Sequence, residues 1–430
     1  MDPIYIFVFG LFVLMGLGLP VFVALGLTCM LVLIATSTSG SIPVELLSLK
    51  LMSTLSGFPL LAIPLFILAA NILNTGSATR RIFDFANVLV GYMRGGLGHA
   101  NVVASMVFAG MSGTAAADAA GLGALEIKAM KERGYCLKYS TGITAASSVI
   151  GPIIPPSVAM LVYGWLADVS VSQLFIGGVL PGLLMALLLM GMTVAWSYRT
   201  EMPRRAFPSW QEFCNSFKEA FFPLLTPAII AGGIWTGIFS PTEAGAVACV
   251  YGLFLGFCVC RDLSFRDLYE VLRKSAEFSA VILLIIAVSG FYGWLLLRLQ
   301  IPQQLAGYLV GLELPGMALI LLMMLFFLLV GCFMSVIESV LILTPILAPA
   351  LLTLGVDPLF FGVFMIVTLS AGVITPPFGT VLFVMVPITG MSFQQVVKAV
   401  LPFFIPILVT ILLMAIFPGI VTALPGLIFG

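Results

Sequence analysis

Two stretches of the sequence decide the fold: GPIIPPS at 151–157 and GVITPPFG at 372–379. Each lies inside an apolar segment of about 29 residues, 140–168 and 361–389, which is long enough to cross a bilayer as a helix. Consecutive prolines remove backbone donors and disfavour helical geometry at the residue before them. Each segment is therefore predicted to be a membrane helix that is broken near its middle.

The composition supports this membrane assignment. The chain has 430 residues, of which 61% are hydrophobic and only 8% are charged, whereas soluble domains have about 25% charged residues. Apolar runs of 20 residues or more predict helices, because the strands of a membrane barrel are short and alternate in polarity. A formal net charge of zero argues against nucleic acid as a partner. We expect an all-α polytopic membrane protein.

The two proline-containing stretches belong to a duplicated sequence. Pro155-Pro156 precedes Pro376-Pro377 by 221 residues, and the same offset relates other pairs along the chain. These are Gly110 and Gly331, Gly134 and Gly355, Gly151 and Gly372, Gln173 and Gln394, and Leu180-Pro181 and Leu401-Pro402. One register that persists over about 70 residues without a gap indicates an internal repeat.

The flanking charges predict that the two copies are inverted. The apolar stretch 97–127 is flanked by basic residues, whereas the matching stretch 318–348 is flanked by Glu313 and Asp357 with no Lys or Arg nearby. The basic residues are Arg94, Lys128, Lys131, Arg133 and Lys138. By the positive-inside rule the first set faces the cytoplasm and the second faces out. The copies therefore have opposite orientations.

Each of these stretches is also predicted to be a re-entrant hairpin. A single crossing needs about 20 residues and changes sides, but these stretches have about 31 and carry one side's charges at both ends. The tips would lie near 110–114 and 331–335. Non-helical backbone at that depth is tolerated only where protein or a water-filled cavity surrounds it.

The chain therefore divides into two inverted repeats. The first, 1–218, is expected to hold helix 4–36, helix 57–75, an arm at 80–94, hairpin 97–127, broken helix 140–168, helix 172–197 and a cytoplasmic link. The second, 219–430, is expected to hold helices in 219–260, helix 275–297, an arm at 303–316, hairpin 318–348, broken helix 361–389 and helix 394–423.

The hairpin tips and the breaks in the two proline-containing helices predict a site for ions and substrate near the membrane midplane. Unwound backbone presents carbonyl oxygens that suit sodium, and half-helix N-termini suit a carboxylate. The expected sodium ligands are Ser112, Gly113, Thr114, Asp118, Gly151 and Pro155, and Gly331, Ser335, Gly372, Thr375 and Gly379 in the second copy. Ser157 and Thr380 are expected substrate ligands. The alternative is that small residues at these positions only permit close helix packing.

Three acids near helix starts have alternative roles. A carboxylate at the bilayer centre costs about 2.5–3.5 kcal/mol, so Asp118 is expected either to ligate sodium or to cap a helix. Glu338 follows the second tip, and both an ionic and a structural role stay open for it. SPTE at 240–243 has the pattern of a capping box, which predicts a structural role for Glu243.

These motifs resemble the large membrane subunit of TRAP (tripartite ATP-independent periplasmic) transporters. The matching strings are PLFILAANIL at 64–73, GGLGHANVVASMVFAGMSGTAAADAAGLG at 95–123, ASSVIGPIIPPS at 146–157, GIFSPTEAGAVACVYGL at 237–253 and GVITPPFGTVLFV at 372–384. Family members have their sodium sites in the hairpins and broken helices, which matches the positions named above. Many relatives carry an acid at the position of Ser335, so the second-copy ligand set departs from the family pattern.

The resemblance implies an elevator-type, sodium-coupled importer in the bacterial inner membrane. Its substrate would be a small organic acid such as a sialic acid or a C4-dicarboxylate, delivered by a soluble periplasmic binding protein. A small membrane subunit would be the second partner. Because no extra N-terminal four-helix region is visible, we expect that subunit to be a separate chain. Sodium is the coupling ion, and no cofactor is expected.

Three other classes of protein remain as alternatives. A related carrier that works alone, without a binding protein, is the main one. A channel is less suited to paired inverted hairpins with broken helices than a carrier that alternates its access. An enzyme would need a catalytic constellation, but the sequence has one histidine and no Walker A or HExxH pattern.

Overall fold

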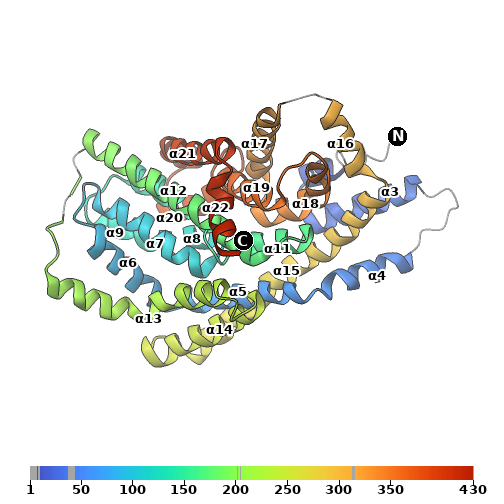
Figure 1. Ribbon diagram of the computed structural model, residues 1–430. Coiled ribbons are helices and arrows are strands. Elements are labelled where there is room, and N and C mark those ends of the chain that lie inside the picture. The colour runs from blue at the N-terminus through green and yellow to red at the C-terminus, as the bar shows by residue number, and fades with distance from the viewer. Residues whose placement is uncertain are drawn as a thin grey trace.

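The computed structural model describes residues 7, 10–36, 44–200, 202–203, 205–311 and 315–429, and within them all regular structure is helical (Figure 1). Seven of these helices are long and apolar enough to cross a membrane, or eight if the bent pair 47–55 and 59–75 is counted as one span. The predicted all-α polytopic fold is confirmed.

The first helices form the N-terminal part of a supporting layer. They are α2 (Leu11–Gly16), α3 (Val21–Thr36), α4 (Val44–Leu55), a 3-10 turn η2 (Phe58–Leu61) and α5 (Ala62–Thr75). The expected continuous helix over 4–36 is instead interrupted between α2 and α3, because Gly18 adopts a left-handed φ of 84° and Pro20 follows it. Residues 4–6, 8 and 9 of that expected helix lie outside the described residues.

The rest of the first copy contains an arm, a hairpin, a broken helix and a long helix. These are α6 (Ala78–Val90), then α7 (Gly96–Ser112) with α8 (Ala115–Ala120) and α9 (Leu122–Glu132), then α10 (Leu137–Ser148) with α11 (Val158–Ala167), and α12 (Val171–Arg199). The backbone between α10 and α11 is non-helical and contains a cis peptide bond at Pro155-Pro156.

The second copy repeats this order. It contains α13 (Trp210–Trp235), α14 (Pro241–Phe254) with a π-helical turn η3 (Leu255–Val259), α15 (Phe265–Arg298), α16 (Ile301–Gly311), α17 (Gly316–Phe333), α18 (Val336–Thr353), α19 (Pro358–Gly372), α20 (Thr380–Thr389), α21 (Phe393–Ile416) and α22 (Gly419–Phe429). The expected helix 394–423 is instead two helices, separated at Phe417 and Pro418. Residues 312–314 of the expected arm lie outside the described residues.

Contacts between the copies are reciprocal. Helix α11 packs on α18, and the equivalent α20 packs on α8; α10 packs on α21, and the equivalent α19 packs on α12. This exchange of partners is what an approximate two-fold axis between the copies produces. The hairpins and broken helices therefore form a joint core, in which α12 and α21 also contact each other.

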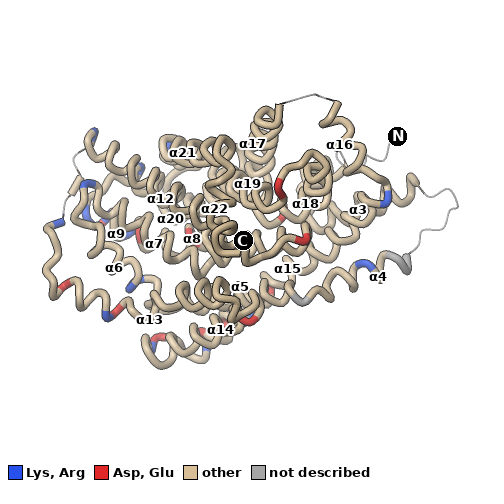
Figure 2. Tube along the Cα trace, in the orientation of Figure 1, with Lys and Arg blue, Asp and Glu red and all other residues tan. Residues whose placement is uncertain are grey.

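The remaining helices flank that core. Helix α5 packs on α14 and α15, α15 also packs on α3 and α4, and α13 packs on α14. Figure 1 shows α13, α14, α15 and α4 following one another along one side of the molecule. Figure 2 shows that Lys and Arg gather around α6, α9 and the start of α13, while α19 and α22 in the middle carry few charges.

Candidate functional site

The first hairpin tip lies directly against the first helix break. Gly113 connects α7 and α8 with a left-handed φ of 63°, and a Cβ atom added to it would lie 2.6 Å from the carbonyl oxygen of Pro156. A Cβ atom on Gly151 would lie 3.0 Å from the carbonyl oxygen of Thr114. Tip and break are thus close enough at both points to require glycine, and the predicted first-copy residues around them lie together.

The side-chain hydroxyls at this junction are mostly used as helix caps. Thr114 Oγ1 accepts the Ala117 N–H at 3.3 Å, and Ser157 Oγ accepts the Met160 N–H at 3.3 Å. The hydroxyl of Ser112 is buried and has no hydrogen-bond partner among the described residues. Ion coordination here would therefore rely on backbone carbonyls and on Ser112.

In the second copy the close approach is between the last turns of α17 and α19, just before the tip and the break. A Cβ atom on Gly331 would lie 2.6 Å from the carbonyl oxygen of Leu369 and 2.9 Å from the Cα atom of Gly372. Around Gly379, two carbonyl oxygens converge: a Cβ atom there would lie 2.8 Å from that of Thr375 and 2.9 Å from that of Val373. Such clustered carbonyls are the ligands that a hard monovalent cation prefers.

Glu338 has a structural role at the second tip. Ser335 caps α18 by accepting the Glu338 N–H at 3.4 Å, and the Glu338 carboxylate accepts the Ser335 N–H at 3.1 Å. This reciprocal pair is a capping box. The box predicted at Ser240 and Glu243 is confirmed as well, with the Ser240 N–H 2.7 Å from Glu243 Oε2.

Other predicted residues of the second copy differ in availability. The Thr375 hydroxyl donates to the carbonyl of Ala371 at 2.9 Å, so its oxygen keeps acceptor capacity. Thr380 is the first residue of α20, and its side chain is exposed.

The two junctions differ in exposure. Pro155, Pro156 and Ser157 are buried, whereas the second break exposes Phe378 at 54%. Its ring packs on that of Phe333, itself 50% exposed, with 5.6 Å between the centroids. The first copy has serines at the equivalent positions, Ser112 and Ser157.

Asp118 lies in the first turn of α8 and is fully buried, at 1% exposure. Neither carboxylate oxygen has a hydrogen-bond partner in the part of the chain that the structure describes. The Ser105 hydroxyl lies beside it but donates to Ser147 at 3.1 Å. Because Thr114 rather than Asp118 caps α8, the capping alternative for Asp118 is not realised.

Sequence reasoning missed a buried polar network around Asp118. Glu126 on α9 is 0% exposed, interacts with the charge of Asp118, and has no hydrogen-bond partner among the described residues. Asn101 donates to Thr144 at 2.6 Å and accepts from Ser147 at 2.7 Å. The available signal was an acid within the predicted hairpin and polar residues at helical spacing in 101–105 and 144–148.

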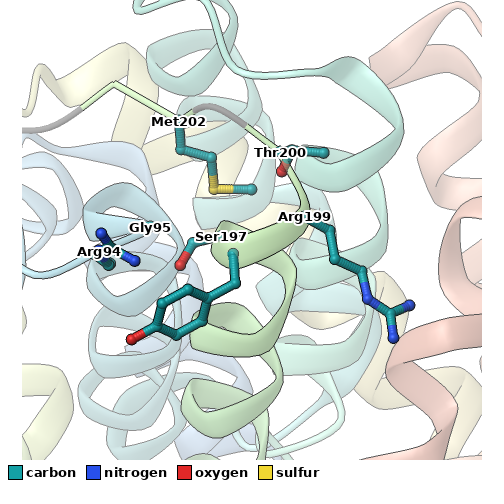
Figure 3. A pocket seen from close by; sticks show the side chains of 7 residues that line it. Arg94, Gly95, Ser197, Arg199, Thr200 and Met202 are labelled. Carbon is teal, nitrogen blue, oxygen red and sulfur yellow. The ribbon is translucent and has the colours of Figure 1, made fainter.

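A separate cavity of about 330 Å³ lies at the end of α12. Figure 3 shows that Arg94 and Arg199 lie on opposite sides of that helix end. The Arg94 guanidinium instead lies over the Tyr198 ring, 4.6 Å from its centroid. These two arginines therefore do not converge on one anion.

A duplicated helical membrane protein with paired tips and breaks, reciprocal packing and a buried polar network is a secondary transporter in architecture. The chain belongs to the family described as the DctM component of tripartite ATP-independent periplasmic transporters, whose sequence model matches residues 8–420. It is therefore a multi-pass inner-membrane transporter subunit and not an enzyme, and its relatives are named as TRAP transporter permeases.

Three relatives illustrate this membership. The sialic acid TRAP transporter large permease protein SiaM of Vibrio cholerae is 38% identical over 98% of both chains. The sialic acid TRAP transporter permease protein SiaT of Haemophilus influenzae is 40% identical over 88% of this chain, which spans 62% of that relative's length. The C4-dicarboxylate TRAP transporter large permease protein DctM of Pseudomonas aeruginosa is 38% identical over 89% of this chain and 90% of its own.

One solved structure is similar in fold. The YdaH transporter of Alcanivorax borkumensis, described as having an unusual topology, aligns with a TM-score of 0.68 over 97% of this chain and 98% of its own. At 15% identity this likeness concerns the fold alone.

Proposed function

We propose that this chain is the large membrane subunit of a sodium-driven importer of a small organic acid. It would receive the acid from a periplasmic binding protein and work beside a separate small membrane subunit. The observation that carries the proposal is the close approach of hairpin and broken helix in both copies, of Gly113 to Pro156 and of Gly331 to Gly372. Family membership supports the two partners.

The chemistry of the junctions favours sodium as the coupling ion. Carbonyl oxygens lie close together at Thr375 and Val373, and the buried Ser112 hydroxyl lacks a partner among the described side chains. The buried carboxylate of Asp118 supplies negative charge nearby in the same hairpin. An unpaired acid at this depth is usually functional, because burying it is costly.

The relatives' names support a small acid as the substrate. They name sialic acid, C4-dicarboxylates, 2,3-diketo-L-gulonate and isethionate. All of these are small organic anions, which suit the N–H groups at the starts of α11 and α20, beside Ser157 and Thr380.

Sodium coupling supplies enough free energy for accumulation. Two sodium ions entering with a monoanion would move one net charge inward. A tenfold sodium gradient supplies about 1.4 kcal/mol per ion, and 100 mV supplies about 2.3 kcal/mol per charge. The sum is roughly 5 kcal/mol, which corresponds to accumulation of several thousandfold without ATP.

The packing favours an elevator-type movement. The joint core of hairpins and broken helices would move as one body against α3, α4, α5, α13, α14 and α15. Close contacts between the layers, such as Gly110 against Pro227 on α13, would then exist in only part of the transport cycle.

The test is uptake of labelled acids into proteoliposomes that contain this chain and its small subunit. A candidate binding protein is added outside, and an inward sodium gradient is compared with potassium alone. Uptake that needs both sodium and the binding protein is the expected result. Uptake with sodium but no binding protein would identify a stand-alone carrier, and uptake indifferent to sodium would contradict the ion sites.

A further inference from the structure

A cavity of about 480 Å³ lies between the supporting helices and the core, outside the tip-to-break junctions. It is lined by α15 and the end of α4 on one side, and by α18, the end of α11 and the start of α19 on the other. This volume falls in the range of ordinary small-ligand pockets. By the positive-inside assignment, the ends of α11 and α18 lie on the periplasmic side.

Two buried hydroxyls at the wall of this cavity lack partners. Ser289 on α15 and Thr344 on α18 are both 0% exposed, and neither hydroxyl makes a hydrogen bond to any described residue. Other buried hydroxyls bond within their own helix: Ser339 on α18 and Thr368 on α19 donate to the carbonyl four residues earlier, at 2.9 and 2.7 Å. Ser279 on α15 also lacks a partner among the described residues, but it does not line this cavity. A buried hydroxyl without a partner is unfavourable, so a ligand group that bonds to it would be favoured.

The internal repeat shows that these hydroxyls are not required by the fold. The first copy has Leu68 at the position equivalent to Ser289 and Gly123 at the position equivalent to Thr344. Gly123 is closely packed there, because a Cβ atom on it would lie 2.7 Å from Thr144 Cγ2. The two unpartnered hydroxyls therefore have no equivalent in the first copy, although first-copy residues of α4 and α11 also line the cavity.

The rest of the lining includes aromatic rings and one carboxylate, and two cations lie outside the lining, over the ring of Trp294. Trp165 and Trp294 supply rings, and Asp168 supplies an exposed carboxylate at the end of α11. Lys50 Nζ lies 5.7 Å and Arg298 Cζ lies 5.4 Å from the centroid of the Trp294 ring. No ion pair to either cation is formed by the described residues, so both can attract an anion.

We propose that this cavity is an outer binding site for the transported acid, and that it selects a hydroxylated monocarboxylate of sugar-acid size. The carboxylate would face Lys50 and Arg298, a ring face would pack on tryptophan, and ligand hydroxyls would meet Ser289, Thr344 and Asp168. Asp168 disfavours a second carboxylate, which separates such acids from C4-dicarboxylates. Because Gly293 and Pro345 hold α15 against α18, the ligand reaches both hydroxyls only when these helices separate slightly.

This inference rests on the proposed function and deepens it. Its test measures binding of sialic acid, with succinate as the comparison, to the complex of this chain and its small subunit in nanodiscs without sodium. Wild type is compared with the double variant Ser289→Ala/Thr344→Val, which removes two hydroxyls with little change in volume. Loss of two hydrogen bonds predicts roughly fivefold to 150-fold weaker binding of sialic acid. Succinate binds weakly to both proteins.

The matched control is Ser140→Ala/Thr410→Val, because those buried hydroxyls bond to carbonyls within their own helices. It should bind sialic acid as wild type does. A second variant, Ala348→Phe, fills the cavity and should abolish binding while the complex stays monodisperse. In uptake assays the Ser289/Thr344 variant should raise KM and retain kcat.

The outcomes separate this site from the proposed function. Sodium-driven uptake with unchanged KM and binding in the Ser289/Thr344 variant would overturn the outer site and leave the function intact. If sialic acid binds wild type more tightly than the Ser289/Thr344 variant but no acid is taken up with sodium, the outer site stands and the proposed function is overturned. The proposal would also be overturned if sialic acid does not bind and a phospholipid copurifies with wild type but not with Ala348→Phe. The cavity would then be a lipid site.

Discussion

Asp118 and Glu338 lie in the first turns of the equivalent helices α8 and α18, but their carboxylates have different surroundings. Glu338 completes a capping box with Ser335. Asp118 is buried, and no described group donates a hydrogen bond to it. Glu338 therefore stabilises a helix start, while the Asp118 carboxylate is available to a cation. Substitutions at the two positions should have different consequences.

We predict that Asp118→Asn raises the sodium concentration for half-maximal uptake by at least about tenfold. The substitution keeps the shape of the side chain and removes one negative charge, and interactions of charged groups contribute about 1.5–3 kcal/mol. Sodium titration of uptake in proteoliposomes measures the effect. Glu338→Gln is the control, because glutamine also completes a capping box. An Asp118→Asn protein with the sodium dependence of wild type would exclude this carboxylate from the ion site.

Sequence patterns predict single residues only where the role is local. The capping box at Ser240 depends on spacing within four residues and was predicted, whereas the box at Ser335 has the same spacing but was not predicted, because Ser335 was expected to bind sodium. The isolation of Asp118 and the burial of Glu126 depend on how α8 and α9 pack on α7 and α10. That packing brings together segments that are far apart in the sequence. A local sequence pattern therefore does not show which hydroxyls lie near the Asp118 carboxylate.

At the scale of elements, Gly331 near the end of α17 permits the close contact of the second hairpin with α19. We predict that Gly331→Ala lowers the free energy of unfolding by about 1–3 kcal/mol, as expected for overpacking, and reduces uptake at least tenfold. The added Cβ atom would lie 2.6 Å from the carbonyl oxygen of Leu369, in the last turn of α19 before the break. Thermal unfolding and initial uptake rates measure both effects.

Gly316→Ala is the matched control for that substitution. Gly316 begins the same helix, α17, and a Cβ atom added there would meet nothing within 4 Å. We expect unfolding and uptake close to those of wild type. Equal behaviour of the two variants would mean that the close approach at Gly331 is unimportant for transport.

The breaks themselves were predictable, since Pro155-Pro156 and Pro376-Pro377 exclude helix by covalent geometry. Weaker interruptions were not. A lone Pro20 or Pro418 is compatible with the first turn of a helix as well as with the end of one. We therefore expected continuous helices over 4–36 and 394–423, but the structure interrupts each of them. Whether a single proline ends a helix depends on the packing around it.

At the scale of the whole molecule, the two junctions differ although their sequences are repeats. The first is covered, in part by α13, where a Cβ atom on Gly110 would lie 2.6 Å from Pro227 Cβ. The second exposes Phe333 and Phe378. A repeat predicts equivalent elements, but it does not predict which copy the supporting helices cover. That asymmetry is what a carrier with alternating access requires of any single conformation.

The proposed relative movement can be tested with two disulfides of equal geometry. A Cβ atom on Gly293 would lie 3.0 Å from Pro345 Cβ, across the boundary between α15 and the core helix α18. A Cβ atom on Gly245 would also lie 3.0 Å from Leu65 Cβ, but both residues belong to the supporting layer. Both pairs are near the Cβ separation of about 3.8 Å that a disulfide needs.

We predict that oxidising Gly293→Cys/Pro345→Cys, in a background without the seven native cysteines, reduces uptake more than tenfold, and that reduction restores it. The cross-link would hold the core against its support, whereas Gly245→Cys/Leu65→Cys would join two helices that do not move relative to each other. Uptake by the second variant should be unchanged by oxidation. If the first variant also transports normally when fully cross-linked, α18 does not move against α15 during transport, and the elevator mechanism proposed for this core is wrong.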